Sequence, residues 1–144
     1  MAIWFAGRHP SVEVLNAHAP RTLVGHVDIR FIEVGDDFLR ATMPVDARTR
    51  QPYGVLHGGA SVVLAETMGS TGAAACIDQE RFQCFGQEIN ANHLRPVSSG
   101  LVTGLARPFH IGARSQVWGI EIRDARQHLT CIARITIATV ARRV

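Results

Sequence analysis

Lysine is absent from this sequence, and all 15 basic residues of the 144-residue chain are arginines. The absence of lysine excludes Schiff-base catalysis and the lysine-dependent phosphate-binding loop. With 12 acidic residues, the net charge is only +3. Because the arginines are scattered and not interleaved with aromatic residues, the pattern gives little support to nucleic-acid binding. An anionic small molecule, such as a phosphate-bearing cofactor, suits this charge better.

Cysteine is also scarce, at 3 residues. Cys76, Cys84 and Cys131 are odd in number and have no C-x-x-C spacing, which argues against disulfides and against a zinc site. Residues 1–9 lack the basic segment and the long apolar core of a signal peptide. The sequence therefore predicts a reduced, cytoplasmic protein.

No apolar run indicates a membrane span, because Glu66 and several glycines interrupt the one candidate, residues 58–77. We interpret this run as a buried helix instead. The chain has the length of one domain, and 47% of its residues are hydrophobic, which is enough for a core. With no internal repeat and no linker, we predict a single domain, residues 1–144.

The hydrophobic pattern predicts one long helix among strands. Ser11 caps a short helix over residues 11–18, and residues 58–76 form a long helix that is apolar on every face. A helix without a polar face must be surrounded by protein. The expected strands are residues 23–34, 38–43, 82–94, 101–109, 116–123 and 129–140, with a turn at 35–37. This count predicts an α+β fold in which an antiparallel sheet of about six strands wraps around the long helix.

Glu66 is the first candidate for chemistry. It is the only formally charged residue between Arg50 and Asp78, and it lies in the middle of the predicted buried helix. Burying an unpaired carboxylate costs roughly several kcal/mol, so such a group usually has a task or a partner. The alternative is a glutamate at the one point where the helix faces solvent.

The start of the same helix is the second candidate. His57, Gly58 and Gly59 precede its first turn, and glycines let a ligand approach the backbone closely. The first amides of a helix are unpaired donors at the positive end of the helix dipole, which can stabilise an oxyanion. The alternative is an ordinary junction between a loop and a helix.

Together, the two candidates imply a second copy of the chain. Glu66 lies eight residues beyond Gly58, which is about 12 Å along a helix axis. One helix therefore cannot place its own carboxylate beside its own first amides. If the two groups cooperate, they come from two helices packed antiparallel across a two-fold axis. The small residues Ala65, Gly69, Ser70 and Gly72 would permit the two helices to approach closely.

Other polar residues give weaker signals. Ser70 is four residues after Glu66 and on the same helical face, where it hydrogen-bonds either the carboxylate, a water or its own backbone. His57, His93 and His110 have no metal-ligand spacing and no supporting cysteine or aspartate, so we predict no metal site.

Several ordered motifs resemble the hotdog-fold acyl-CoA thioesterases. The long one is PVDARTRQPYGVLHGGASVVLAE over residues 44–66, and the others are GQEINANH, RPFHIG and QVW, which begin at Gly86, Arg107 and Gln116. The resemblance covers nearly the whole chain. It is strongest to the branch that includes aryl-CoA thioesterases of menaquinone and enterobactin metabolism, near the phenylacetate-pathway thioesterases.

This resemblance implies a long helix wrapped by an antiparallel sheet, homodimers that commonly pair into homotetramers, and sites at the dimer interface. Glu66 would be the catalytic carboxylate and Gly58 the oxyanion amide from the opposite subunit. Gln51 and His57 would lie beside the thioester, and Ser70 would support Glu66 or the water.

The resemblance also implies a binding site for the acyl group and coenzyme A (CoA). Its residues would be Gly86, His93, Leu94, Arg95, Pro96, His110, Ile111, Gly112, Ala113, Arg114 and Ser115. Arg95 and Arg114 are the expected phosphate partners. Two positions depart from the family: Ala113 replaces a frequent serine, and Tyr53 replaces the usual phenylalanine.

We therefore expect a thioesterase that hydrolyses an aromatic acyl-CoA without a metal or other cofactor. Glu66 is either the nucleophile or the general base. One alternative is a hotdog hydratase, which would need an aspartate–histidine pair that the helix lacks. The other is a non-catalytic acyl-CoA sensor, which usually carries a further domain. No membrane or nucleic-acid partner is expected.

Overall fold

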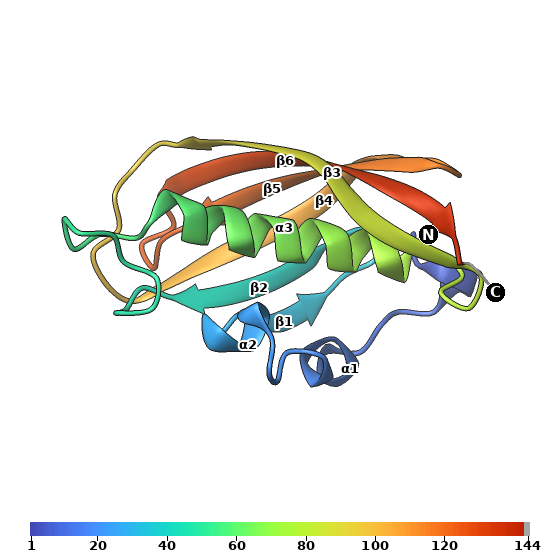
Figure 1. The fold of residues 1–144 in the computed structure, drawn as a ribbon, viewed down its shortest axis with the longest axis horizontal. Helices are drawn as coiled ribbons and strands as arrows, with labels where there is room; N and C mark the ends of the chain where they lie inside the picture. Colours follow the sequence, from blue (N-terminus) through green and yellow to red (C-terminus); the bar gives the residue numbers. More distant parts are fainter. Residues whose placement is uncertain (143–144) are drawn as a thin grey trace.

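The computed structural model describes residues 1–142, so the last two residues of the predicted domain lie outside the described part. One long helix, α3 (Gly58–Ala75), lies across one face of a six-stranded antiparallel sheet (Figure 1). The order of the strands is β1-β2-β4-β5-β6-β3. Their bounds are Arg30–Val34 (β1), Leu39–Pro44 (β2), Phe82–His93 (β3), Leu101–Ile111 (β4), Ser115–Arg123 (β5) and Leu129–Ala141 (β6). The predicted α+β hotdog fold is confirmed.

The small residues of α3 place this helix against its own sheet. Seven residues of the helix are buried on the face toward the sheet: Ser61, Leu64, Ala65, Met68, Gly69, Gly72 and Ala73. A Cβ atom on Gly72 would lie 2.6 Å from the ring of Trp118, and one on Gly69 would lie 2.4 Å from Ile135. The interpretation that Ala65, Gly69 and Gly72 serve contact between two helices is therefore wrong, since they face the sheet instead.

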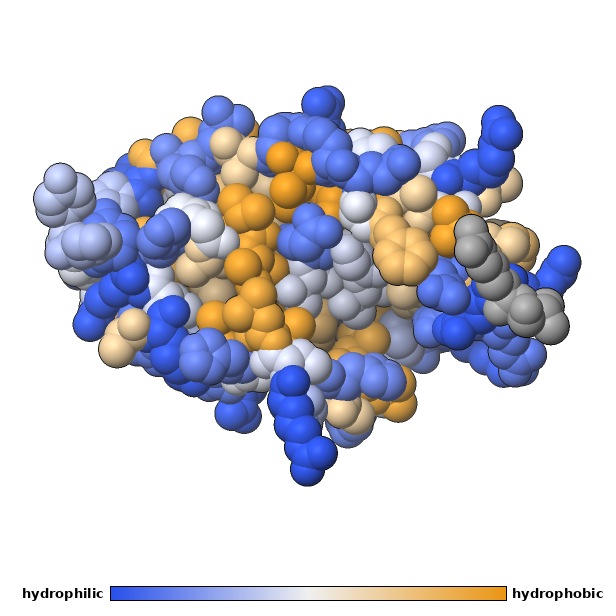
Figure 2. All heavy atoms as spheres, viewed as in Figure 1, coloured by the Kyte–Doolittle hydropathy of each residue, from blue (hydrophilic) through white to orange (hydrophobic). Residues whose placement is uncertain are grey.

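The opposite face of α3 is not covered by the described residues of this chain. Val63, Thr67 and Ser70 on this face are only half-buried. In the view of Figure 2, hydrophobic residues gather near the centre of this face, and hydrophilic residues surround them. The expectation that protein surrounds the helix on every side is thus met on one face only within a single chain.

The segments before the first strand cover the lower edge of the sheet in Figure 1. The predicted helix at 11–18 is confirmed as α1 (Val12–Ala17), where the Ser11 side chain accepts a hydrogen bond from the Val14 amide. The predicted strand at 23–34 is wrong in its first half. There the Thr22 hydroxyl caps a short helix, α2 (Leu23–His26), and the strand begins only at Arg30.

Strand β3 forms one edge of the sheet and pairs only with β6. It has 12 residues, and its burial pattern contains no fully buried position. A long edge strand with unpaired backbone groups is a ready template for pairing with another chain. The other strands end within two residues of their predicted bounds, with β4 continuing past Phe109 to Ile111. Within residues 1–142, no helix is both long and apolar enough to cross a membrane.

Candidate active site

The start of α3 presents one free backbone donor. The His57 side chain caps the helix, because its Nδ1 accepts a hydrogen bond from the Gly59 amide at 2.8 Å. The His57 carbonyl accepts from the amides of Ala60 and Ser61 at 2.9 and 3.2 Å. Among residues 1–142, the Gly58 amide has no acceptor. An unpaired amide at the positive end of a helix dipole is suited to stabilise an oxyanion.

A cavity of about 340 Å³ opens at this helix start. Its lining residues are Gln51, Val55, Leu56, Gly58, Ser61, His93, Leu94, Arg95, Pro96 and Thr130. The structure thus brings together six of the predicted site residues, drawn from the loop before α3, from α3 itself and from the end of β3. A Cβ atom on Gly58 would lie 2.8 Å from His93 Nε2, so only glycine fits here without displacing that ring.

The loop before α3 is held by Gln51. Its side-chain oxygen accepts a hydrogen bond from the Tyr53 amide, and its backbone amide donates to the Val55 carbonyl at 2.8 Å. The Tyr53 side chain projects from this turn and is 92% exposed. An aromatic ring that projects from a fixed turn beside a cavity is available to contact a ligand or a second chain.

Glu66 lies in the middle of α3, on the flank that faces β3. A Cβ atom on Gly86 would lie 2.2 Å from Glu66 Oε1, so the carboxylate rests directly over that glycine. Partial burial raises the pKa of Glu66 above its ordinary value, while hydrogen bonding with the Ser70 hydroxyl opposes the rise. Within the described residues, no cation pairs with this carboxylate. A half-buried carboxylate with a raised pKa is typical of a catalytic base or nucleophile.

The hairpin between β4 and β5 carries the remaining predicted residues, His110 to Ser115. The Gly112 amide donates to the Ser115 carbonyl at 2.9 Å, and the Thr139 amide donates to the Arg114 carbonyl at 3.0 Å. Ser115 pairs with Ala138 of β6, which in turn pairs with Phe85 of β3. The hairpin therefore lies at the same end of the sheet as Gly86.

One chain does not bring all of the predicted residues together. Gly58 lies against His93 at the end of β3, whereas Glu66 lies against Gly86, inside the first half of the strand. Seven residues of strand separate Gly86 from His93, which is about 23 Å. The structure therefore divides the predicted site into a donor end, with Gly58, and a carboxylate end, with Glu66.

Burial raises the pKa of all three cysteine thiols above the ordinary value. Burial raises the pKa of Cys76 to about 12, with a smaller contribution from neighbouring Cys84. A thiol with so high a pKa is not a nucleophile at neutral pH. Within residues 1–142, no three histidine, cysteine or acidic side chains are grouped as metal ligands would be.

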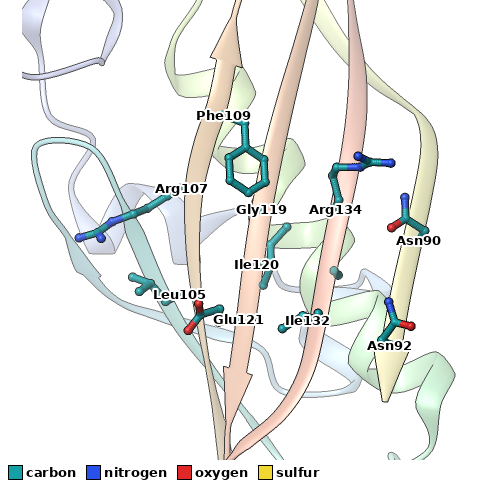
Figure 3. Close-up of a pocket in the computed structure, with 11 residues that line it drawn as sticks. Asn90, Asn92, Leu105, Arg107, Phe109, Gly119, Ile120, Glu121, Ile132 and Arg134 are labelled. Carbon is teal, nitrogen blue, oxygen red and sulfur yellow. The ribbon is translucent and has the colours of Figure 1, made fainter. Parts of the chain in front are cut away.

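Two further hollows have little or no signal in the sequence. One, of about 550 Å³, lies on the outer face of the sheet, where side chains of four strands point away from α3 (Figure 3). Its lining includes Asn90, Arg107, Phe109 and Arg134. The alternation of apolar and polar residues in these strands is its only sequence signal.

The other hollow, of about 620 Å³, lies between the amino-terminal segment and the end of α3. Its lining includes Val14 and Leu15 of α1, and Thr71, Ala74 and Ala75 of α3. No sequence signal indicates it, because the segments that form it are about 60 residues apart in the chain.

Comparisons with known proteins give consistent matches. A model of the thioesterase superfamily matches residues 53–131. The chain is 52% identical to the 1,4-dihydroxy-2-naphthoyl-CoA hydrolase of Escherichia coli K12 over 91% of this chain and 96% of that protein. It is 48% identical to the proofreading thioesterase EntH of Cronobacter turicensis, over 91% and 95% of the two chains. A solved structure of a mutant thioesterase from Pseudomonas aeruginosa matches with a TM-score of 0.95 and 44% identity, over 98% and 100% of the two chains.

Proposed function

Because this chain belongs to the thioesterase superfamily and is a thioester hydrolase, we propose that it hydrolyses aromatic acyl-CoA thioesters at a site shared by two subunits. The observation that carries the proposal is the free Gly58 amide, which lies at the positive end of α3 in the same cavity as Gln51 and His93. The second support is the half-buried Glu66 with its raised pKa. An oxyanion donor and a carboxylate are the two groups that acyl transfer to water needs.

A single two-fold axis would join the two ends of the site. Gly58 lies beside His93 and Glu66 beside Gly86, so α3 and β3 run side by side in opposite directions. The midpoint between Gly58 and Glu66 on the helix therefore lies near the midpoint of β3. An axis at that point sets each Glu66 beside Gly58 of the partner subunit and pairs the two exposed β3 edges. The proposed homodimer thus has a defined two-fold axis and a defined contact between the two β3 edges.

The chemistry follows from this arrangement. The thioester carbonyl oxygen would accept a hydrogen bond from the Gly58 amide, which stabilises the negative charge of the tetrahedral intermediate. Glu66 either attacks the carbonyl carbon, forming an anhydride that water then cleaves, or removes a proton from the attacking water. In both routes, the carbon–sulfur bond breaks and the sulfur leaves as the CoA thiolate, so the products are a free acid and CoA.

Tyr53 supports the preference for an aromatic acyl group. In such an antiparallel dimer, the loop before Gly58 would lie beyond the partner's Glu66, toward the partner's Ser70. The hollow lined by Thr71, Ala74 and Leu15 begins there. An aryl group leaving the reacting carbon would therefore lie between the exposed Tyr53 ring and that hollow, where ring stacking is favourable. The name of the Escherichia coli relative, which refers to a dihydroxynaphthoyl thioester, agrees with this assignment.

The outer face of the sheet supports the predicted homotetramer. Phe109, Ile111 and Ile132 are 74%, 40% and 38% exposed, and Phe109 and Ile132 border the hollow of Figure 3. Arg107, Arg134 and Glu121 line it as well. A face that mixes exposed apolar groups with charges of both signs suits a second copy of the dimer. The cytoplasmic location and the single domain over residues 1–144 remain predictions.

Release of free CoA from benzoyl-CoA, measured with a thiol reagent for the wild type and Glu66→Ala, tests the proposal. We expect a loss of about 1,000-fold in the variant, which corresponds to about 4 kcal/mol of barrier. Equal rates would exclude Glu66 from the chemistry. If the wild type cleaves fatty acyl-CoAs but not benzoyl-CoA or other aryl-CoAs, the proposed aromatic preference is wrong.

A further inference from the structure

A further cavity of about 560 Å³ adjoins the one at the start of α3. It lies at the turn between β5 and β6, and its lining includes Ser98, Asp124, Arg126 and His128. The two cavities share Arg95 and Pro96. The cavity at the free Gly58 amide and the cavity at the β5–β6 turn therefore adjoin at Arg95 and Pro96.

Two guanidinium groups in this cavity have no partner within residues 1–142. Neither Arg95 nor Arg126 makes a side-chain hydrogen bond or an ion pair there. Arg123, three residues before Arg126 on the same turn, differs in this respect. It pairs with Glu121 at 2.8 Å and donates to the Gln127 carbonyl at 3.1 Å. The cavity thus holds positive charge that the protein itself does not neutralise.

The one carboxylate in the cavity is occupied by the turn. Asp124 accepts hydrogen bonds from the amides of Arg126 and His128, each at 2.9 Å, and its other oxygen lies 3.1 Å from His128 Nδ1. These bonds outweigh desolvation, so the pKa of Asp124 lies below its ordinary value. Asp124 therefore shapes the turn and presents Arg126, and it makes no ion pair with the Arg126 guanidinium.

The opposite wall of the cavity is fixed by backbone hydrogen bonds. The Leu56 amide donates to the Val97 carbonyl at 2.7 Å, and the Val45 amide donates to the Gly100 carbonyl at 2.8 Å. The Arg50 guanidinium also donates to the Ser98 carbonyl at 2.8 Å. A wall held at three points is preorganised, which lowers the entropy lost when a ligand binds.

We propose that this cavity binds phosphate groups of the CoA portion of the substrate, with Arg126 as a phosphate ligand beside Arg95. This inference rests on the proposed function, which places the thioester at Gly58 and so directs the pantetheine arm along the shared wall. Guanidinium groups form charge-assisted, two-pronged hydrogen bonds with phosphate oxygens. Arg126 and His128 lie outside the motifs that carry the family resemblance, so those motifs do not indicate this part of the site.

The test compares Arg126→Gln with Arg123→Gln, a matched control on the same turn whose arginine is already paired. For Arg126→Gln we expect KM for benzoyl-CoA to rise about tenfold at unchanged kcat. Hydrolysis of benzoyl-pantetheine, which lacks the nucleotide, should be unchanged. Benzoyl-dephospho-CoA then tells which phosphate is bound: an unchanged effect of the substitution indicates the diphosphate, and a lost effect indicates the phosphate on the ribose.

Direct binding of CoA, measured by calorimetry, separates this inference from the proposed function. We expect Arg126→Gln to weaken binding about tenfold at low salt and less at high salt, because salt screens exposed charges. That result, obtained together with a wild type that does not cleave benzoyl-CoA, would refute the proposed aromatic substrate and leave the phosphate site standing. Equal affinity of wild type and variant, or equal losses with benzoyl-CoA and benzoyl-pantetheine, would overturn the phosphate site.

Discussion

Two regions of β3 differ in the chemistry that lies beside them. Near His93, the structure offers donors and positive charge, namely the Gly58 amide and the Arg95 guanidinium. Near Gly86, it offers an acceptor, the Glu66 carboxylate, whose pKa is raised by burial. Neither end alone can both polarise a carbonyl and deliver a nucleophile to it. In the proposed mechanism, this separation makes pairing of two chains a condition of activity.

Disabling the donor end in one variant and the carboxylate end in another tests whether the two ends act across two chains. We expect Glu66→Ala to lose about 1,000-fold in kcat, and Gly58→Val about 100-fold or more because its side chain would collide with His93 and displace the oxyanion amide. When the variants are mixed under conditions that exchange subunits, half of the dimers would contain one intact site of two. Activity should then recover to about a quarter of the wild type.

Each variant subjected to the same exchange by itself is the control for this experiment. Circular dichroism and gel filtration show whether each variant is folded and assembled. No recovery in the mixture of two folded variants would show that both groups act within one chain, and the two-fold arrangement would then be wrong.

Gly86→Ala perturbs the carboxylate end alone. The added methyl would lie 2.2 Å from Glu66 Oε1, so the carboxylate must move away from its position over β3. Displacement of a reacting group by about 1 Å typically costs about 100-fold in rate. We expect a loss of this size in kcat with benzoyl-CoA, at nearly unchanged melting temperature.

Gly119→Ala on the outer face of β5 is the matched control for Gly86→Ala. Its methyl would also meet a side chain, the Phe109 ring at 2.6 Å, but that ring is 74% exposed and free to turn aside. Equal losses of kcat in the two variants would mean that Gly86 is needed for the structure of the sheet and not for the position of Glu66.

Ser70→Ala tests how the carboxylate end is tuned. In the proposed mechanism, ionised Glu66 is the active form, so activity should fall as the pH drops through its raised pKa. Ser70 lowers that pKa, and its removal raises it further. We expect the acid limb of the kcat profile to move to higher pH, with several-fold loss at acidic pH and little change at alkaline pH. A uniform loss at every pH would assign Ser70 a different role.

The smallest effect is expected at the donor end, from Tyr53→Ala. Loss of the exposed ring should lower kcat/KM for benzoyl-CoA about fivefold, in keeping with an aromatic contact of about 1 kcal/mol. Hydrolysis of hexanoyl-CoA should be nearly unchanged, since it offers no ring to stack. Tyr53→Phe keeps the ring and should behave as the wild type. Equal losses of kcat/KM for both substrates would mean that Tyr53 contributes to the dimer contact and not to substrate selectivity.

Much of the fold could be predicted because its pattern is local. Residues 58–75 lack proline and any charge except Glu66, so the long helix is evident, and β5 alternates buried and half-buried residues as a strand on a core should. The error at residues 23–29 has a physical cause as well. Leu23, Val24 and Val27 look like a strand, but the Thr22 cap closes a helical turn over them.

The site was only partly predictable, because its two ends depend on contacts between distant residues. The spacing of Gly58 and Glu66 along a helix already showed that one chain cannot unite them. The contacts of Gly86 with Glu66 and of Gly58 with His93 are set by the position of β3 in the sheet, which no periodicity reveals. The same holds for the proposed role of Arg126, which depends on Arg123 being paired and Arg126 not.

The close contact of α3 with its sheet bears on how this enzyme can evolve. Gly69 and Gly72 leave no room for a methyl group against Ile135 and Trp118, so the helix has little freedom to shift when its neighbours mutate. The Tyr53 turn, the amino-terminal segment and the β5–β6 turn all lie outside that contact. New substrate preferences can therefore arise by drift in these peripheral segments while the reacting groups stay in register. Substitutions should be tolerated in these peripheral segments and not on the buried side of α3.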